Sequence, residues 1–149
     1  MTFILNTMTS FLNHFIKILS GLLSLVILFH LLILFKIIPY DITWGGRIKN
    51  DTEMYVFEAI SILLNVCLIW VLFMKGNFVK YRFSGTALNI ILWIFFAIFL
   101  LNTIGNFFAK TFFEKQFALL TGIIAFLLWK ILKRKNNMQL PGQSSSHNK

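Results

Sequence analysis

Formal charge is scarce in this sequence, and acidic side chains are its rarest charged groups. Charged residues make up 13% of the 149 positions, and only five of them are Asp or Glu. Soluble globular domains carry about 25% charged residues. Hydrophobic residues reach 58% and the mean hydropathy is +0.78. The composition therefore disfavours a soluble domain and indicates an integral membrane protein in contact with the lipid bilayer.

Cysteine is nearly absent. The one cysteine, Cys67, lies inside an apolar run. A single cysteine can form neither a disulfide within the chain nor a metal site made of several cysteines. We therefore expect Cys67 to be a small residue of the core.

Catalytic and cofactor motifs are also missing. The sequence holds no CxxC, HExxH, GxSxG, Walker-type or GxGxxG pattern, so thiol redox, zinc protease, serine hydrolase and nucleotide-binding functions lack their usual starting motif. Two of the three histidines, His14 and His147, lie outside the apolar runs, which excludes a three-histidine metal site. We predict no cofactor, metal or catalytic residue, and the sequence favours a protein that is not an enzyme.

Long apolar runs are what the sequence has in abundance. A hydrocarbon core about 30 Å thick takes roughly 20 helical residues to cross. Four runs meet that length, and we predict spans at residues 18–38, 51–74, 84–103 and 116–132. Short turns force neighbouring helices to run antiparallel. The predicted fold is therefore all-α, an integral membrane four-helix up-down bundle with one domain over residues 18–132.

Local signals predict where these spans begin and end. Pro39 has no amide hydrogen and disfavours helix before it, so the first span should end near residue 38. Asn50 followed by Glu53 is typical of a capping box and predicts a start of the second span near Asp51. Asn102, Gly105 and Asn106 indicate the end of the third span, and a polar turn is expected over residues 110–115.

The two ends of the chain differ from the spans. Residues 1–17 alternate apolar and polar side chains at helical spacing, which favours an amphipathic helix. This helix either lies in the headgroup layer or extends the first span, and the sequence leaves both alternatives open. Residues 133–149 hold too few apolar groups to offset the entropy of ordering, so a disordered tail is expected.

The basic residues predict the orientation. Nine of the 14 Lys and Arg residues belong to the N-terminus, the second turn and the tail, and five belong to the first and third loops. Cytoplasmic loops carry the excess of basic residues. Both termini should therefore be cytoplasmic in a plasma (inner) membrane. The net charge of +9 then lies beside anionic headgroups, and nucleic acid is not an expected partner.

The first loop is expected to face outward with several polar groups. Trp44 is an amphipathic aromatic residue suited to the headgroup layer. Arg47 and Lys49 can pair with Asp41, Asp51 and Glu53, although exposed pairs contribute only about 0–1 kcal/mol each. We treat Asp41, Trp44, Arg47 and Asp51 as the candidate residues of this loop.

A polar stripe runs along the second span. Asp51, Glu58 and Asn65 recur every seven residues with Ser61 among them, so they share one helix face. Such a face should point to other helices and away from lipid. Glu58 also lies close enough to the helix start for its carboxylate to extend towards headgroup water.

His30 lies at a similar depth in the first span. We predict a contact between His30 and Glu58, with Asn89 of the third span completing a cluster with Ser61 and Asn65. An ionisable residue inside a membrane is a candidate functional residue, while a neutral, hydrogen-bonded histidine is the structural alternative.

Two functions follow as hypotheses, and no motif ties the chain to a family of known activity. The first is an accessory or structural subunit that packs as a homo-oligomer or with a larger membrane protein. The alternative is a small solute or proton pathway through the intramembrane polar cluster.

Overall fold

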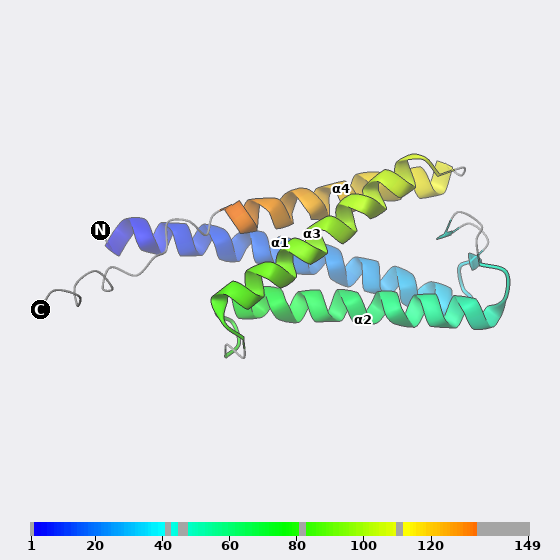
Figure 1. Ribbon diagram of the computed structural model, residues 1–149, viewed down its shortest axis with the longest axis horizontal. Coiled ribbons are helices and arrows are strands. Elements are labelled where there is room, and N and C mark those ends of the chain that lie inside the picture. The colour runs from blue at the N-terminus through cyan, green and yellow to red at the C-terminus, as the bar shows by residue number, and fades with distance from the viewer. Residues whose placement is uncertain (1, 41–42, 45–47, 81–82, 110–111, 134–149) are drawn as a thin grey trace, which may run out of the picture.

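The computed structural model describes residues 2–40, 43–44, 48–80, 83–109 and 112–133. This part of the chain is helical and contains no strand (Figure 1). The helices are α1 (Thr2–Leu34), α2 (Asp51–Lys75), α3 (Gly85–Phe107) and α4 (Phe112–Lys133). Each contains a segment that is long and apolar enough to cross a membrane. Within the described residues, the prediction of an all-helical fold with four such helices is confirmed.

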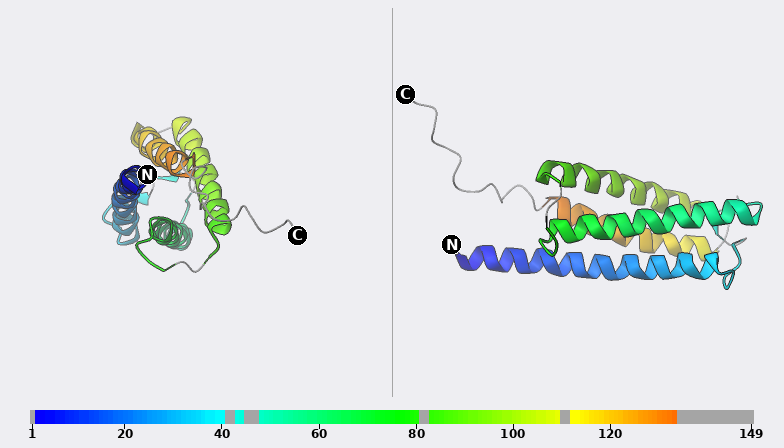
Figure 2. Two further views of the ribbon diagram at one scale, coloured as in Figure 1. Left: turned by 90° about the vertical axis from the view of Figure 1, so that its left-hand side faces the viewer. Right: turned by 90° about the horizontal axis from the view of Figure 1, so that it is seen from below.

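The helices alternate in direction and form two hairpins. α1 packs along α2 and α3 packs along α4, while the two hairpins share a shorter region of contact. Figure 1 shows α3 and α4 diverging from α1 and α2 towards one end of the bundle. We call this the loop end, because α1 and α3 finish there and α2 and α4 begin there. The α2–α3 turn lies at the opposite end (Figure 2).

α1 is one continuous helix of 33 residues. At 1.5 Å per residue it is about 50 Å long, which exceeds the thickness of a hydrocarbon core. Residues 2–17 continue the helix that contains the first candidate span, Ser10–Leu34. The segment is thus continuous with the first candidate span, and its place relative to the headgroup layer stays a prediction.

The predicted end of the first span beside Pro39 is wrong, because α1 already ends at Leu34. Lys36 adopts a left-handed conformation with φ 58°, and the amide of Ile37 donates to the carbonyl of Leu32 at 2.9 Å. This bond pattern is a Schellman-type helix end, which usually contains glycine at the left-handed position. A lysine there gives no such signal in the sequence.

The cap of α2 lies where the sequence predicted it. The Asn50 side chain accepts a hydrogen bond from the amide of Glu53 at 2.9 Å, and α2 begins at Asp51. The Glu53 carboxylate accepts from the amide of Lys49 at 2.9 Å, one residue before the usual partner in a capping box. The helix then runs to Lys75.

α3 and α4 are both longer than predicted. α3 continues through Asn102, Gly105 and Asn106 to Phe107, so the predicted end near residue 103 is wrong. α4 begins at Phe112, within the segment predicted to be a polar turn. Asparagine and glycine in a helix each cost about 1 kcal/mol or less. Packing between α3 and α4 offsets these costs.

Leucine-rich packing closes the bundle at the opposite end. All four helices contribute side chains with 0% exposure, and their contacts are apolar. We call this set the leucine layer: Leu19, Leu23, Leu68, Leu72, Leu88, Leu92, Ile124 and Leu128. The hairpins are thus held together at one end and separate towards the other.

Cys67 does not belong to this core, and that prediction is wrong. The side chain is exposed on α2. The buried face of this part of α2 contains Asn65, Leu68 and Leu72, at helical spacings of three and four residues. Cys67 falls on the other side of the helix.

Candidate functional site

Glu58 is the most deeply buried acid among the described residues, with 0% exposure. Its Oε2 lies 2.5 Å from Nδ1 of His30, and its Oε1 accepts a hydrogen bond of 2.9 Å from Nε1 of Trp44. Both carboxylate oxygens therefore have partners, as a buried acid requires. The predicted contact between His30 and Glu58 is confirmed, and the carboxylate does not extend to water.

The α1–α2 hairpin explains this contact. His30 lies about one turn before α1 ends, and Glu58 lies about two turns after α2 begins. Because the two helices run antiparallel from a common connection, these positions meet at similar depth.

The phenyl ring of Phe29, beside His30, contacts Phe117 of α4 at a centroid distance of 4.7 Å.

Trp44 brings the α1–α2 loop back onto the helices. Its backbone has φ 56°, and its ring packs against Phe57 with centroids 5.1 Å apart. Thr43 is buried, and its hydroxyl donates to the carbonyl of Tyr40 at 2.8 Å. Trp44 was predicted as a residue of the headgroup layer, and its bond to Glu58 had no signal in the sequence.

The polar stripe on α2 continues from Glu58 to Asn65, towards the end of the helix. Asn65 is 7% exposed, and its Nδ2 donates to the carbonyl of Ser61 at 2.8 Å. Its Oδ1 is buried and has no hydrogen-bond partner in the described part of the chain. Glu58 and Asn65 therefore face the bundle as predicted, with one acceptor left unsatisfied among the described residues, whereas Asp51 at the start of the stripe is exposed.

Asn89 does not join this cluster, contrary to prediction. It lies in the second turn of α3, at the opposite end of the bundle, where its Oδ1 accepts a hydrogen bond of 2.8 Å from Nζ of Lys75. α3 begins beside the end of α2, so its early residues are far along the bundle from the start of α2. The predicted depth of Asn89 is therefore wrong.

The ion pair formed beside the α1–α2 loop also differs from expectation. Asp51 pairs with Lys36, with 2.5 Å between Oδ2 and Nζ, whereas Arg47 and Lys49 were the basic partners considered for the acids of this loop. The Asp51 hydrogen bond raises the pKa of Lys36 above its ordinary value. Asp41 and Arg47 lie outside the described residues.

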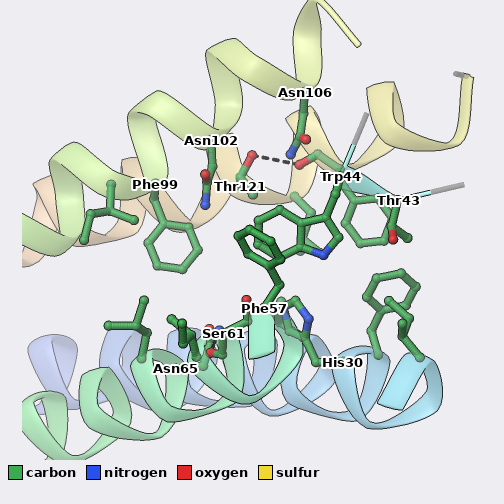
Figure 3. A pocket seen from close by; sticks show the side chains of 18 of the residues that line it. His30, Thr43, Trp44, Phe57, Ser61, Asn65, Phe99, Asn102, Asn106 and Thr121 are labelled. Atoms are coloured by element: carbon green, nitrogen blue, oxygen red, sulfur yellow. Dashed lines mark hydrogen bonds between the residues drawn. The ribbon is translucent and has the colours of Figure 1, made fainter. Parts of the chain in front are cut away.

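A cavity of about 430 Å³ lies between the two hairpins (Figure 3). Its walls are mostly aromatic and aliphatic, with a few polar groups among them. The cavity lies towards the loop end, where its lining includes Thr43, Trp44, Asn106 and Glu114. The leucine layer lies at the opposite end. The lining residues are Val26, Phe29, His30, Ile33, Thr43, Trp44, Phe57, Ile60, Ser61, Leu64, Asn65, Phe95, Ile98, Phe99, Asn102, Asn106, Glu114, Phe117, Leu120 and Thr121.

Several polar residues of the cavity were not anticipated as site residues. Asn102 and Asn106 were interpreted as a helix end, although their spacing of four puts both on one face of α3. Oγ1 of Thr121 in α4 accepts a hydrogen bond of 3.0 Å from Oγ1 of Thr103 in α3. Asn102, Asn106 and Thr121 are each an uncharged polar residue inside an apolar run, and this pattern could have marked them as candidates. Glu114 lies at the start of α4 and does not show this pattern.

The described residues contain no group of three or more His, Cys, Asp or Glu side chains able to hold a metal ion. Comparison with known proteins finds no matching family model, no matching curated protein and no matching solved structure.

Proposed function

We propose that this protein is a multi-pass membrane protein that holds one small amphiphilic molecule between its two hairpins. The observation that carries this proposal is the cavity of about 430 Å³ with apolar walls and a few polar groups. Binding sites for small molecules typically measure about 300–1,000 Å³ and have this kind of lining.

Exposed apolar side chains support insertion in a bilayer. Every helix carries large hydrophobic residues on its outer surface, including Leu25, Leu63, Leu101 and Leu119. Lipid chains would cover these faces. The distribution of basic residues supports cytoplasmic termini in a plasma (inner) membrane, which would turn the loop end and its cavity outward.

The size and depth of the cavity favour a single-chain ligand. A volume of about 430 Å³ holds one acyl chain with a small polar group more readily than a whole two-chain phospholipid. A chain from the surrounding bilayer would contact the aromatic walls, among them Phe57 and Phe99. Burial of apolar surface contributes about 25 cal/mol per Å².

The leucine layer favours binding over conduction. Its side chains are apolar and fully buried, and they lie between the polar groups of the cavity and the Lys75–Asn89 pair at the opposite end of the bundle. A solute or proton pathway would require this layer to open. That pathway and the role of an accessory subunit remain predictions.

Fluorescence of Trp44 tests the proposal, because Trp44 is the one described tryptophan that lines the cavity. A variant with Trp70, Trp93 and Trp129 changed to Phe isolates its signal. In lipid nanodiscs, a bromine-labelled single-chain alcohol should quench Trp44 in a saturable manner.

A matched pair on α1 supplies the control. Val26 lines the cavity, whereas its neighbour Leu25 is exposed on the outer face. Val26→Phe should fill part of the cavity and weaken saturable quenching, and Leu25→Phe should leave it unchanged. Quenching that rises linearly with probe concentration, or that responds equally to both substitutions, would contradict a binding site.

A further inference from the structure

The amide of Asn65 is only half satisfied. Its Nδ2 is bonded to the carbonyl of Ser61, but Oδ1 has no hydrogen-bond partner among the described residues, and the residue is buried with 7% exposure. Few buried polar atoms in native proteins stay unpaired, because each loses its bonds to water without replacement. Asn65 lines the cavity, so a hydrogen-bond donor held in the cavity would supply the missing partner.

Polar groups on the facing wall lie opposite this acceptor. Figure 3 shows Asn102 and Asn106 on α3 across the cavity from Ser61 and Asn65 on α2. An amide both donates and accepts hydrogen bonds. A small polar group between the walls can therefore donate to Asn65 and interact with an amide of α3.

The charges of the lining exclude some head groups. None of the described lining residues is Lys or Arg. The imidazole of His30 is already engaged with Glu58. A phosphate or carboxylate in the cavity would be removed from water without a free cation among the described lining residues to pair with, and such burial is strongly unfavourable.

We infer that the ligand of this cavity is an uncharged, single-chain amphiphile whose hydroxyl group donates a hydrogen bond to Oδ1 of Asn65. The chain of this long-chain alcohol would lie along the aromatic walls. This inference rests on the proposed function and adds the chemical class of the ligand and the residue that selects it.

Three bromine-labelled probes of equal chain length test the inference: a long-chain alcohol, its methyl ether and the corresponding carboxylate. The quenching of Trp44 is measured in nanodiscs with the variant that retains this tryptophan alone. The alcohol should bind about tenfold more tightly than the ether, because the ether cannot donate to Asn65. The carboxylate should bind more weakly than the alcohol at pH 8.

Two asparagines provide a matched pair of variants. Asn65 and Asn89 are both 7% exposed, and in the described part of the chain each has one amide atom without a hydrogen-bond partner, but Asn89 lies outside the cavity. Asn65→Leu should abolish the preference for the alcohol over the ether. Asn89→Leu should keep that preference.

The outcomes separate this inference from the proposed function. Saturable binding of alcohol and ether with equal affinity would overturn the hydroxyl assignment and leave the binding function standing. Tighter binding of the carboxylate, or a preference that survives Asn65→Leu, would also overturn the assignment. Absence of saturable quenching by all three probes would overturn the binding function itself.

The wild-type protein gives a second measurement if Asn65→Leu does not fold. The melting temperature in nanodiscs should rise more with the alcohol than with the ether, since a ligand that binds only the folded state stabilises it by mass action. Equal shifts for the two probes would contradict the inference.

Discussion

Trp44 and Glu58 are joined by a hydrogen bond of 2.9 Å from the indole Nε1 to the carboxylate Oε1, across 14 positions of sequence. This bond attaches the α1–α2 loop to the buried acid of α2. The same indole ring lines the cavity. The side chain that covers Glu58 therefore also forms part of the proposed binding site.

The His30–Glu58 pair should stabilise the fold as a unit. We expect His30→Leu to lower the free energy of unfolding by about 3 kcal/mol, because it leaves a buried carboxylate without its imidazole partner. Adding Glu58→Leu should recover part of that loss. The measurement is unfolding in detergent for a double-mutant cycle. His14→Leu, at an exposed position on α1, is the control, and strictly additive effects would contradict the coupling.

The position of Asn89 can be checked by cross-linking in a Cys67→Ser background. Lys75→Cys with Asn89→Cys should be joined by a short thiol cross-linker, because Lys75 Nζ and Asn89 Oδ1 are 2.8 Å apart. His30→Cys with Asn89→Cys should not react, since these positions lie towards opposite ends of the bundle. Cross-linking of the second pair alone would place Asn89 in the polar cluster.

The cap of α2 should contribute measurably to stability. Asn50→Ala removes the acceptor of the Glu53 amide and should cost about 1 kcal/mol in the free energy of unfolding. Asn50→Asp preserves an acceptor and should cost less. Thermal unfolding in detergent compares the two variants. Equal melting temperatures for wild type and Asn50→Ala would assign the cap to another residue.

The Lys36–Asp51 pair predicts a dependence on alkaline pH. The hydrogen bond with Asp51 raises the pKa of Lys36 in the folded state above 10.5. A group whose pKa is raised in the folded state stabilises the fold. This stabilisation is fully present below the pKa of the unfolded state and is lost as pH rises through the pKa of the folded state.

Wild type should therefore exceed Lys36→Met in melting temperature at pH 8, and the gap should close above about pH 10.5. The gap should be small and should shrink with salt, because both side chains are about half exposed. Lys49→Met, in the same loop, is the control. A gap that widens at high pH would contradict the assignment.

The proposed orientation has its own test. Alkaline phosphatase fused after Lys149 should stay inactive in a bacterial host, and the same enzyme inserted near Gly46 should be active, because the enzyme works only outside the cytoplasm. The expectation follows from the nine basic residues on the side of the termini against five on the other. The reverse pattern of activity would invert the proposed topology.

Local sequence signals were enough for the parts of this protein that depend on neighbouring residues. The four apolar runs have the length of membrane-crossing helices, and Asn50 followed by Glu53 predicts the start of α2. The repeat from Glu58 to Asn65 predicts a polar face turned towards the bundle, because seven residues are close to two turns. Matching distances from a hairpin connection then predict the contact with His30.

Other features depend on contacts between distant segments, and only the tertiary structure decided them. The left-handed turn at Lys36 ends α1 without a glycine, and packing on α4 carries α3 through Asn102. Sequence does not say how far two hairpins diverge. That divergence leaves the cavity, because the leucine layer holds the hairpins together at one end only. The return of the loop onto α2 pairs Trp44 with Glu58, and no described group bonds to the buried Asn65 oxygen.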